Sequence, residues 1–253
     1  MRRPLADAIR LHRKSDAATA PIGSVSERID GAYVDSVREY PAYWHGNRIV
    51  LDRPPVPQEI ERWRELHREV FAWREGAFPA VITWYDQLDV PTPEIVDEVQ
   101  TALLAPAIIG DVPIPDGLRA VDLSSDASWD SAGDLACALF PQYGDFNRWR
   151  LATLRALSER GRGIYRALID ADGNVVASLG AFHADGVGRF ANVATAPEHR
   201  RRGCAAHLIV SGLRDLRKRV DDVVIVADTG GDAERLYRSL GFVPILSIRS
   251  IQR

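Results

Sequence analysis

The chain has few residues that form disulfides or hold a metal ion. It contains two cysteines, Cys137 and Cys204, which lie far apart and without metal-ligand spacing. No two of His12, His45 and His67, the histidines of the N-terminal half, stand at a metal or catalytic spacing. We therefore expect neither a disulfide framework nor a metal site, and a reducing cytoplasm fits this cysteine usage.

Long apolar runs and a strong net charge are also missing. No stretch approaches the roughly 18 uninterrupted apolar residues of a membrane span, and charges interrupt the short apolar run at the N-terminus. The formal net charge is -3, so the chain lacks the overall positive field of a typical nucleic-acid-binding protein. We expect a soluble, cytoplasmic protein with no membrane or nucleic-acid partner, and the sequence leaves a homodimer open.

The apolar residues that are present suffice for a substantial core. They make up 46% of 253 residues, enough for one large or two modest domains. In the N-terminal half the clearest element is a helix over 59–74, whose apolar residues recur at spacings of three and four. The other elements expected there are a short helix near residues 5–13, a loop at 16–26, a turn that leads into a strand over 44–51, a strand at 80–85, a helix that begins at Thr92, and a linker at 105–117. Residues 101–105 could belong to that helix or to a strand.

The C-terminal half has a more regular order of elements. Hairpin turns, capping residues and apolar periodicity divide it into strands and helices. The expected strands are 118–123, 164–169, 175–182, 189–195, 222–227 and 243–251, and the expected helices are 128–140, 146–160, 203–220 and 232–240.

One stretch of this half has the features of an anion-binding site. A half-apolar strand ends before Pro197, and a short polar turn leads through three arginines to Gly203 and the start of a helix. The first N–H groups of a helix are free, and its dipole is positive at this end. The small residues Gly203, Ala205 and Ala206 leave the backbone open to a ligand, so the stretch favours a pyrophosphate cradle. The alternative is a solvated basic turn.

Two motifs in the order of elements above resemble the GNAT acetyltransferase superfamily. Arg200-Arg-Arg-Gly203-Cys-Ala205 is similar to its Arg/Gln-x-x-Gly-x-Gly/Ala acyl-CoA signature. Ala233-Glu-Arg-Leu-Tyr237-Arg-Ser-Leu-Gly241-Phe242 is similar to its C-terminal Ala-x-x-Leu-Tyr-x-x-x-Gly-Phe pattern. The resemblance covers about residues 117–253, and the N-terminal half resembles the degenerate partner repeat of a tandem GNAT protein, without the arginine-glycine turn.

The resemblance implies both a fold and a division of the chain. The fold is α/β (α+β), with a mixed, mostly antiparallel central sheet flanked by helices. Residues 1–115 would form the smaller, degenerate GNAT-like or accessory domain, and residues 116–253 the acetyltransferase domain.

The resemblance also implies acetyl-CoA as co-substrate. Its pyrophosphate would lie on the backbone at the helix start, and its pantetheine arm would pair like an added strand with the end of the preceding strand. The implied cofactor-binding residues are Val193, Ala194, Thr195, Arg200, Arg201, Arg202, Gly203, Cys204, Ala205 and Ala206. Tyr237 is the implied catalytic residue, because a phenol beside the sulfur can hand its proton to the leaving thiolate. The alternative for Tyr237 is a packing role against Phe242.

The sequence departs from the family pattern in two places. The strand 189–195 has no carboxylate to act as general base, which leaves Glu198, His183, Asp185, Asn192, a water chain, or an amine that arrives already neutral. Glycines replace the asparagine that relatives carry before the last motif, so Asp228, Thr229 or backbone groups would take its contact. Cys204 is expected to pack the turn rather than to act as a nucleophile.

These features favour an acyl-CoA-dependent N-acyltransferase, most simply an N-acetyltransferase. Its acceptor would be an amine on a small molecule or a peptide, and the amine would attack the thioester directly. The alternatives are a non-catalytic acyl-CoA-binding or sensing module and a basic-patch protein that binds nucleic acid or another partner. Acidic net charge and the absence of interleaved aromatics argue against the last of these.

Overall fold

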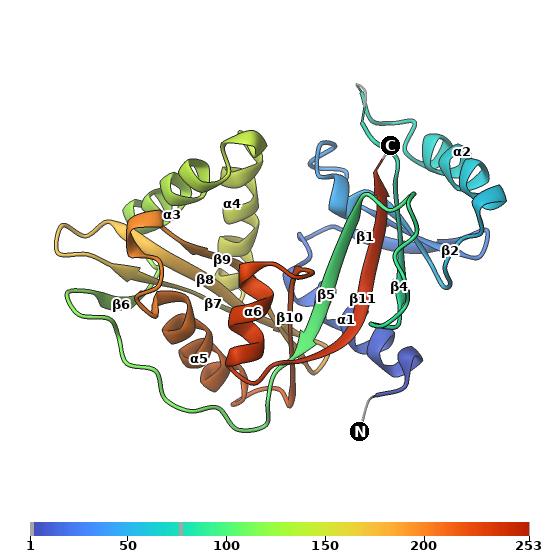
Figure 1. Cartoon of the computed structure of the whole chain (residues 1–253). Helices are drawn as coiled ribbons and strands as arrows, with labels where there is room; N and C mark the ends of the chain where they lie inside the picture. The colour runs from blue at the N-terminus through green and yellow to red at the C-terminus, as the bar shows by residue number, and fades with distance from the viewer. Residues whose placement is uncertain (1–2, 76–77, 253) are drawn as a thin grey trace.

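One continuous mixed sheet extends through the molecule (Figure 1). The computed structural model describes residues 3–75 and 78–252. Within these ranges the strand order is β1-β2-β3-β4-β11-β5-β10-β9-β8-β7-β6, and neighbouring strands are mostly antiparallel. The strands are β1 (Val25–Ile29), β2 (Ala32–Ser36), β3 (Arg48–Leu51), β4 (Val81–Asp86), β5 (Glu98–Leu104), β6 (Arg119–Asp122), β7 (Gly163–Ile169), β8 (Val175–Ala184), β9 (Val187–Thr195), β10 (Asp222–Asp228) and β11 (Val243–Gln252).

Helices cover both faces of the C-terminal part of the sheet (Figure 1). Alternate residues of β8 face opposite sides, so Leu179 and Ala181 pack under α5, whereas Phe182 packs with α3 and α4. Each face therefore has its own apolar core. The helices of the structure are α1 (Leu5–Thr19), α2 (Ile60–Val70), α3 (Asp126–Leu139), α4 (Phe146–Glu159), α5 (Cys204–Leu216) and α6 (Asp232–Ser239). None in the described part of the chain has the length and apolarity to cross a bilayer.

Each half contains the same structural unit. In the N-terminal half, β3 and β4 are parallel and are joined through α2. In the C-terminal half, β9 and β10 are parallel and are joined through α5. A strand-helix-strand crossover beside an antiparallel hairpin therefore occurs twice along the chain, which agrees with the expected partner repeat.

The halves also exchange strands. β5, from the N-terminal half, lies between β10 and β11, and β11, from the C-terminal end, lies between β4 and β5. An apolar core at this junction takes residues from both halves and from α1, among them Ala8, Leu11 and Ile248. Residues 1–115 and 116–253 stay our prediction for the two domains, and their strands interleave in one sheet.

Two expectations for the N-terminal half are wrong. Thr92 starts no helix: residues 91–97 form no helix or strand, and Glu98–Leu104 form β5. Pro91 and Pro93 restrict the chain there, and β10 and β11 both offer a pairing edge to β5, which overrides the weak helical preference of 98–104. The expected loop 16–26 is also wrong at both ends, because α1 continues to Thr19 and β1 begins at Val25.

The remaining elements are confirmed within a few residues at their ends. The helix expected over 59–74 is α2, which ends at Val70, and the one expected over 203–220 is α5, which ends at Leu216. The expected linker 105–117 has no regular structure. It is nevertheless anchored to α5, where His207 Nδ1 lies 2.7 Å from the Val112 carbonyl oxygen and Arg217 donates to the carbonyl of Pro106.

Candidate active site

The arginine-glycine turn leaves a row of backbone N–H groups without acceptors. After β9 a 3₁₀ helix spans Pro197–His199, and Gly203 then takes φ 88° immediately before α5. That left-handed conformation favours glycine, and a Cβ added there would meet open space. Within the described residues, no backbone carbonyl accepts from the N–H groups of 201–206, and the first such bond runs from His207 to Gly203. The turn can therefore donate several hydrogen bonds to an anion.

The three arginines of the turn add charge that no acid neutralises. All three side chains are exposed, and in the described part of the chain no carboxylate lies within 4.0 Å of any of them. Arg200 Nε donates to the Thr195 carbonyl at 3.3 Å, and Arg202 Nη2 donates to the Asp116 carbonyl at 2.8 Å. These bonds hold two guanidinium groups beside the free N–H groups.

Cys204 packs beneath the turn. Its side chain is buried, and Sγ donates to the His199 carbonyl at 3.4 Å. Burial raises the pKa of the thiol, so the reactive thiolate is disfavoured. This geometry agrees with a packing role rather than a nucleophilic one.

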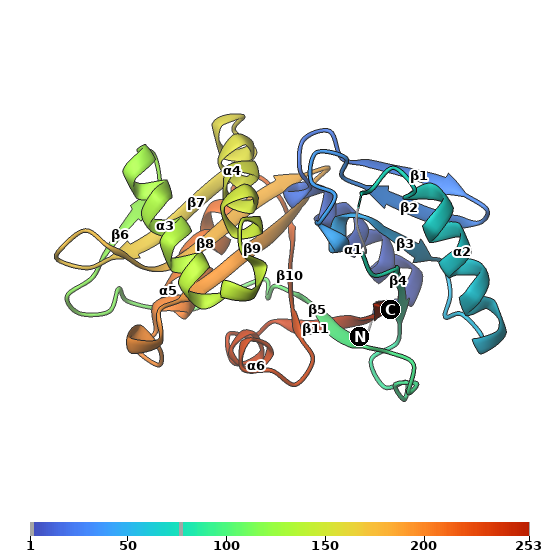
Figure 2. The same cartoon turned by 90° about the horizontal axis from the view of Figure 1, so that it is seen from above.

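Next to the turn, β9 has an open edge. It pairs with β10 only through Val187–Arg189, and from Val224 onward β10 pairs with β5 on its other side. Figure 2 shows the two strands running apart beyond this point. A bulge at Asn192, with φ 49°, shifts the register against β8. Residues 193–195 therefore present backbone groups to the gap between β9 and β10.

Tyr237 lies on α6 close to the same apolar cluster as Cys204. Its side chain is 4% exposed, and its ring centroid is 6.1 Å from that of Phe242. Burial raises the pKa of Tyr237 well above its ordinary value, with Arg189 lowering it and Asp228 raising it. The hydroxyl is thus a proton donor at neutral pH. The packing against Phe242 and an acid role are compatible with this position.

Asp228 and Thr229, the two side chains expected to replace the asparagine of the family, both form hydrogen bonds with β5. Thr229 Oγ1 lies 2.8 Å from Thr101 Oγ1, and its N–H donates to the Val99 carbonyl. Asp228 accepts from Gln100 Nε2 at 3.3 Å. The loop that follows is fixed by Glu234, whose carboxylate accepts from the Gly230 N–H at 2.6 Å. Of the groups expected to take the place of that asparagine, the backbone groups of this loop remain to contact a ligand.

Of the candidates for a general base, Asn192 alone borders the cavity beside β9. His183 of β8 pairs with Gly188 of β9. Gly188 precedes Thr195 by seven residues, so roughly 23 Å of strand separates His183 from the end of β9. Asp185 lies in the turn beyond it, and Glu198 is exposed in the 3₁₀ helix. The candidates for a general base that the sequence offered therefore do not lie together in the fold.

The cavity itself was not visible in the sequence. It has a volume of about 620 Å³ and lies between the two halves, in front of residues 191–194 of β9. Its walls come from the end of α1, from β2 and β3, and from the segment that joins α3 to α4. Six phenylalanine and tyrosine residues line it: Tyr43, Phe140, Tyr143, Phe146, Tyr165 and Phe190.

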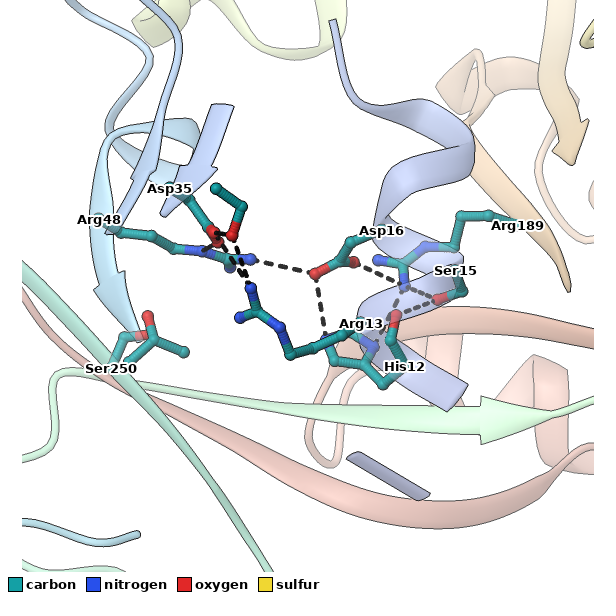
Figure 3. Close-up of polar contacts among 10 residues, drawn as sticks. His12, Arg13, Ser15, Asp16, Asp35, Arg48, Arg189 and Ser250 are labelled. Atoms are coloured by element: carbon teal, nitrogen blue, oxygen red, sulfur yellow. Dashed lines mark hydrogen bonds and ion pairs between the residues drawn. The ribbon is translucent and has the colours of Figure 1, made fainter. Parts of the chain in front are cut away.

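A network of ion pairs joins the halves at one side of this cavity (Figure 3). Asp16 of α1 lies 3.0 Å from Arg48 Nη2 of β3 and 3.2 Å from Arg189 Nη1 of β9. Asp35 of β2 pairs with Arg48 and with Arg13. Despite burial, the neighbouring charges hold the pKa of Asp16 far below its ordinary value. The sequence placed Asp16 in a loop, so it gave no sign of this bridge.

His12 belongs to the same network as a neutral side chain. Its exposed fraction is 1%, and burial lowers its pKa to about 4. Arg189 Nη1 lies 3.3 Å from Nδ1, which must then be the accepting nitrogen, and Nε2 lies 3.5 Å from Asp16. His45, which borders the cavity, is also held neutral, with its pKa lowered to about 4 by burial.

The corresponding turn of the N-terminal half does not form a second cradle. Between β3 and α2 stand Pro54, Pro55 and Pro57, which have no N–H to donate. The Glu59 carboxylate lies at the helix start, where it pairs with Arg53 and accepts from the Val56 N–H. An anion is therefore disfavoured there.

Comparison with known proteins agrees with this architecture. Residues 160–244 match the family model described as acetyltransferase (GNAT) domain. No curated protein matches the chain. Among solved structures, a GCN5-related N-acetyltransferase from Kribbella flavida superposes with a TM-score of 0.67 at 19% identity, over 97% of this chain and 95% of that one.

Two further solved structures extend the likeness over most of the chain. A functionally unknown conserved protein from Staphylococcus epidermidis ATCC 12228 gives a TM-score of 0.70 at 11% identity, over 92% of this chain and 94% of that one. A tandem GNAT protein from the clavulanic acid biosynthesis pathway gives 0.60 at 14% identity, over 92% and 84%. These identities establish the fold alone. The chain thus carries a GNAT acetyltransferase domain at residues 160–244, and nearly its whole length has the fold of the GCN5-related N-acetyltransferases.

Proposed function

We propose that the chain is an acyl-CoA-dependent N-acyltransferase that moves an acetyl group from acetyl-CoA to an amine. The observation that carries the proposal is the arginine-glycine turn beside the open edge of β9. The free N–H groups at 201–206 suit a pyrophosphate, as do the guanidinium groups of the turn, which have no carboxylate beside them in the described part of the chain. Residues 193–195 pair with β8 on one side only, and among the described residues their other edge pairs with no strand, which suits the two amides of a pantetheine arm.

In this proposal each part of the chain has a separate task. Bound acetyl-CoA supplies the thioester. The turn from Arg200 to Ala206 holds the diphosphate, and the edge of β9 directs the arm toward the cavity between the halves. Tyr237 donates its proton to the departing sulfur, because a phenol is protonated at neutral pH and can hand that proton over as charge develops on the sulfur beside it. The amine arrives through the cavity.

The proposal is tested by following free thiol release from acetyl-CoA with a panel of amines and peptide N-termini. The expected result is amine-dependent thiol release and a product heavier by one acetyl group. The competing function is acyl-CoA binding without transfer, which the absence of a carboxylate on β9 favours. Tight acetyl-CoA binding with no transfer to any amine would support that alternative and contradict ours.

A further inference from the structure

The cavity between the halves contains one arginine without a counter-ion. Its walls carry four arginines and two aspartates: Arg13, Arg48, Arg150, Arg189, Asp16 and Asp35. The aspartates pair with three of the arginines, as described above. In the described part of the chain no carboxylate lies within 4.0 Å of Arg150. Two positive charges are therefore in excess, and Arg150 is the member of the set that has no acid beside it.

Arg150 is both buried and held in place. It lies on α4 with an exposed fraction of 8%. Its Nη1 donates to the Thr19 carbonyl at 2.8 Å and lies 3.5 Å from Thr153 Oγ1. No bond between described residues engages Nε or Nη2, yet neither is sealed from solvent. A buried cation without an acid is costly, and a guanidinium fixed by one edge is ready to bind a carboxylate with its other donors.

The wall around Arg150 is aromatic. Tyr43 has its ring 5.9 Å from the Arg150 guanidinium carbon and 5.1 Å from the ring of Phe146. Tyr143 lies 6.1 Å from Phe146, and it is 41% exposed at the surface. Stacked and tilted rings of this kind bind a flat apolar group. The cavity thus offers an anion site and an aromatic surface side by side.

The same cavity reaches the reacting end of the proposed site. Ala191, Asn192, Val193 and Ala194 of β9 border it, and Val226 of β10 borders it from the other side of the gap. An acyl group carried along the edge of β9 would therefore face the same space as Arg150. A molecule small enough for about 620 Å³ can touch both.

We propose that the acceptor is a small amine that also carries a carboxylate and an aromatic side group, such as an aromatic amino acid, and that Arg150 binds the carboxylate. This inference rests on the proposed function. In the reaction the neutral amine nitrogen forms a bond to the thioester carbonyl carbon and loses a proton to solvent, while the carbon–sulfur bond breaks and the sulfur takes a proton from Tyr237. Tyr237 then regains a proton from solvent, so the net proton count is unchanged. The products are the N-acetyl amino acid and free CoA.

The test compares three amines and three variants. Phenylalanine has both features, 2-phenylethylamine lacks the carboxylate, and alanine lacks the ring. We expect kcat/KM for phenylalanine to exceed that for 2-phenylethylamine by about 10–100-fold, the usual worth of charged hydrogen bonds. Arg150→Gln should remove this preference without changing acetyl-CoA affinity, and Arg150→Lys should restore part of it. Arg148→Gln, which removes an arginine of the same helix paired with exposed Asp134, should change neither.

The outcomes separate two claims, the binding of a carboxylate by Arg150 and the acyltransferase function. Transfer to 2-phenylethylamine as efficient as transfer to phenylalanine would overturn the carboxylate role while leaving the acyltransferase proposal standing. The same would follow if Arg150→Gln slowed both amines equally. If acetyl-CoA binds but no amine is acylated, calorimetry with phenylalanine alone decides: binding to the native protein supports the site, and absence of binding overturns it. If Arg150→Gln does not fold, the comparison of amines on the native protein is sufficient.

Discussion

Replacement of Asp16 by asparagine tests whether the ion-pair network joins the halves. The carboxylate lies within 3.5 Å of Arg48, Arg189 and His12. Arg48 keeps Asp35 after the change, but Arg189 loses the one acid it pairs with among the described residues. Asparagine preserves the size of the side chain, so the measured effect is chiefly that of the lost charge.

The expected loss follows from the degree of burial. Breaking a fully buried pair costs about 3–5 kcal/mol, and breaking an exposed one about 0–1 kcal/mol. The Asp16 side chain is 28% exposed and Arg189 is 14% exposed, so the pair lies between these limits but nearer the first. We expect Asp16→Asn to lower the free energy of unfolding by about 2–3 kcal/mol.

Urea unfolding at pH 7.5 measures this change. The midpoint should fall while the slope m stays constant, because the same surface is exposed on unfolding. Asp7→Asn is the matched control on the same helix, since Asp7 pairs with Arg10 at the surface and its loss should cost less than about 1 kcal/mol. An Asp16→Asn midpoint equal to that of Asp7→Asn would refute the bridging role.

Two further predictions concern Tyr237, the proposed proton donor, and the buried side chain of His12. Tyr237→Phe should lower kcat by about 100-fold with little change in acetyl-CoA affinity. Tyr85→Phe, which removes another buried tyrosine hydroxyl, should leave kcat unchanged. An unaltered kcat in Tyr237→Phe would return that residue to a packing role. The pKa of His12 is about 4 in the folded chain, so the unfolded chain takes up that proton first as pH falls below about 6.5, and stability declines between pH 6.5 and 4. His12→Gln should flatten this decline by up to about 1.4 kcal/mol per pH unit, and an unchanged slope would show that the pKa of His12 is the same in the folded and unfolded chains.

The sequence predicted the C-terminal half well because its local signals agree with one another. Ser125 caps α3, the turn after Ile169 is an Asp-Gly hairpin, and the helix after Gly203 has an apolar face. Such signals act over a few residues and need no knowledge of the rest of the chain. The arginine-glycine turn is of this kind, so it could be placed with its free N–H groups.

The N-terminal half was harder because its structure depends on distant partners. The residues of β5 have a weak helical preference, and they become a strand through pairing with β10 and β11, more than 100 residues away. Asp16 lies in a helix that packs on β8, β9 and β11, so its role depends on tertiary contacts. Arg150 resembles any helix-surface arginine in the sequence, and only the folded chain shows that it is buried at a cavity wall.

Calorimetric titration and thermal shift with acetyl-CoA test the role of the arginine-glycine turn most directly. At a hundredfold excess over Kd, acetyl-CoA should stabilise the native protein by about 2.7 kcal/mol. This corresponds to a rise in Tm of about 5–11 °C. Gly203→Glu, which puts a carboxylate and a Cβ into the proposed diphosphate site, should abolish the rise. Gly173→Glu, at a glycine of nearly the same φ in an open hairpin turn, should retain it. Retained affinity in Gly203→Glu would contradict the assignment of the turn.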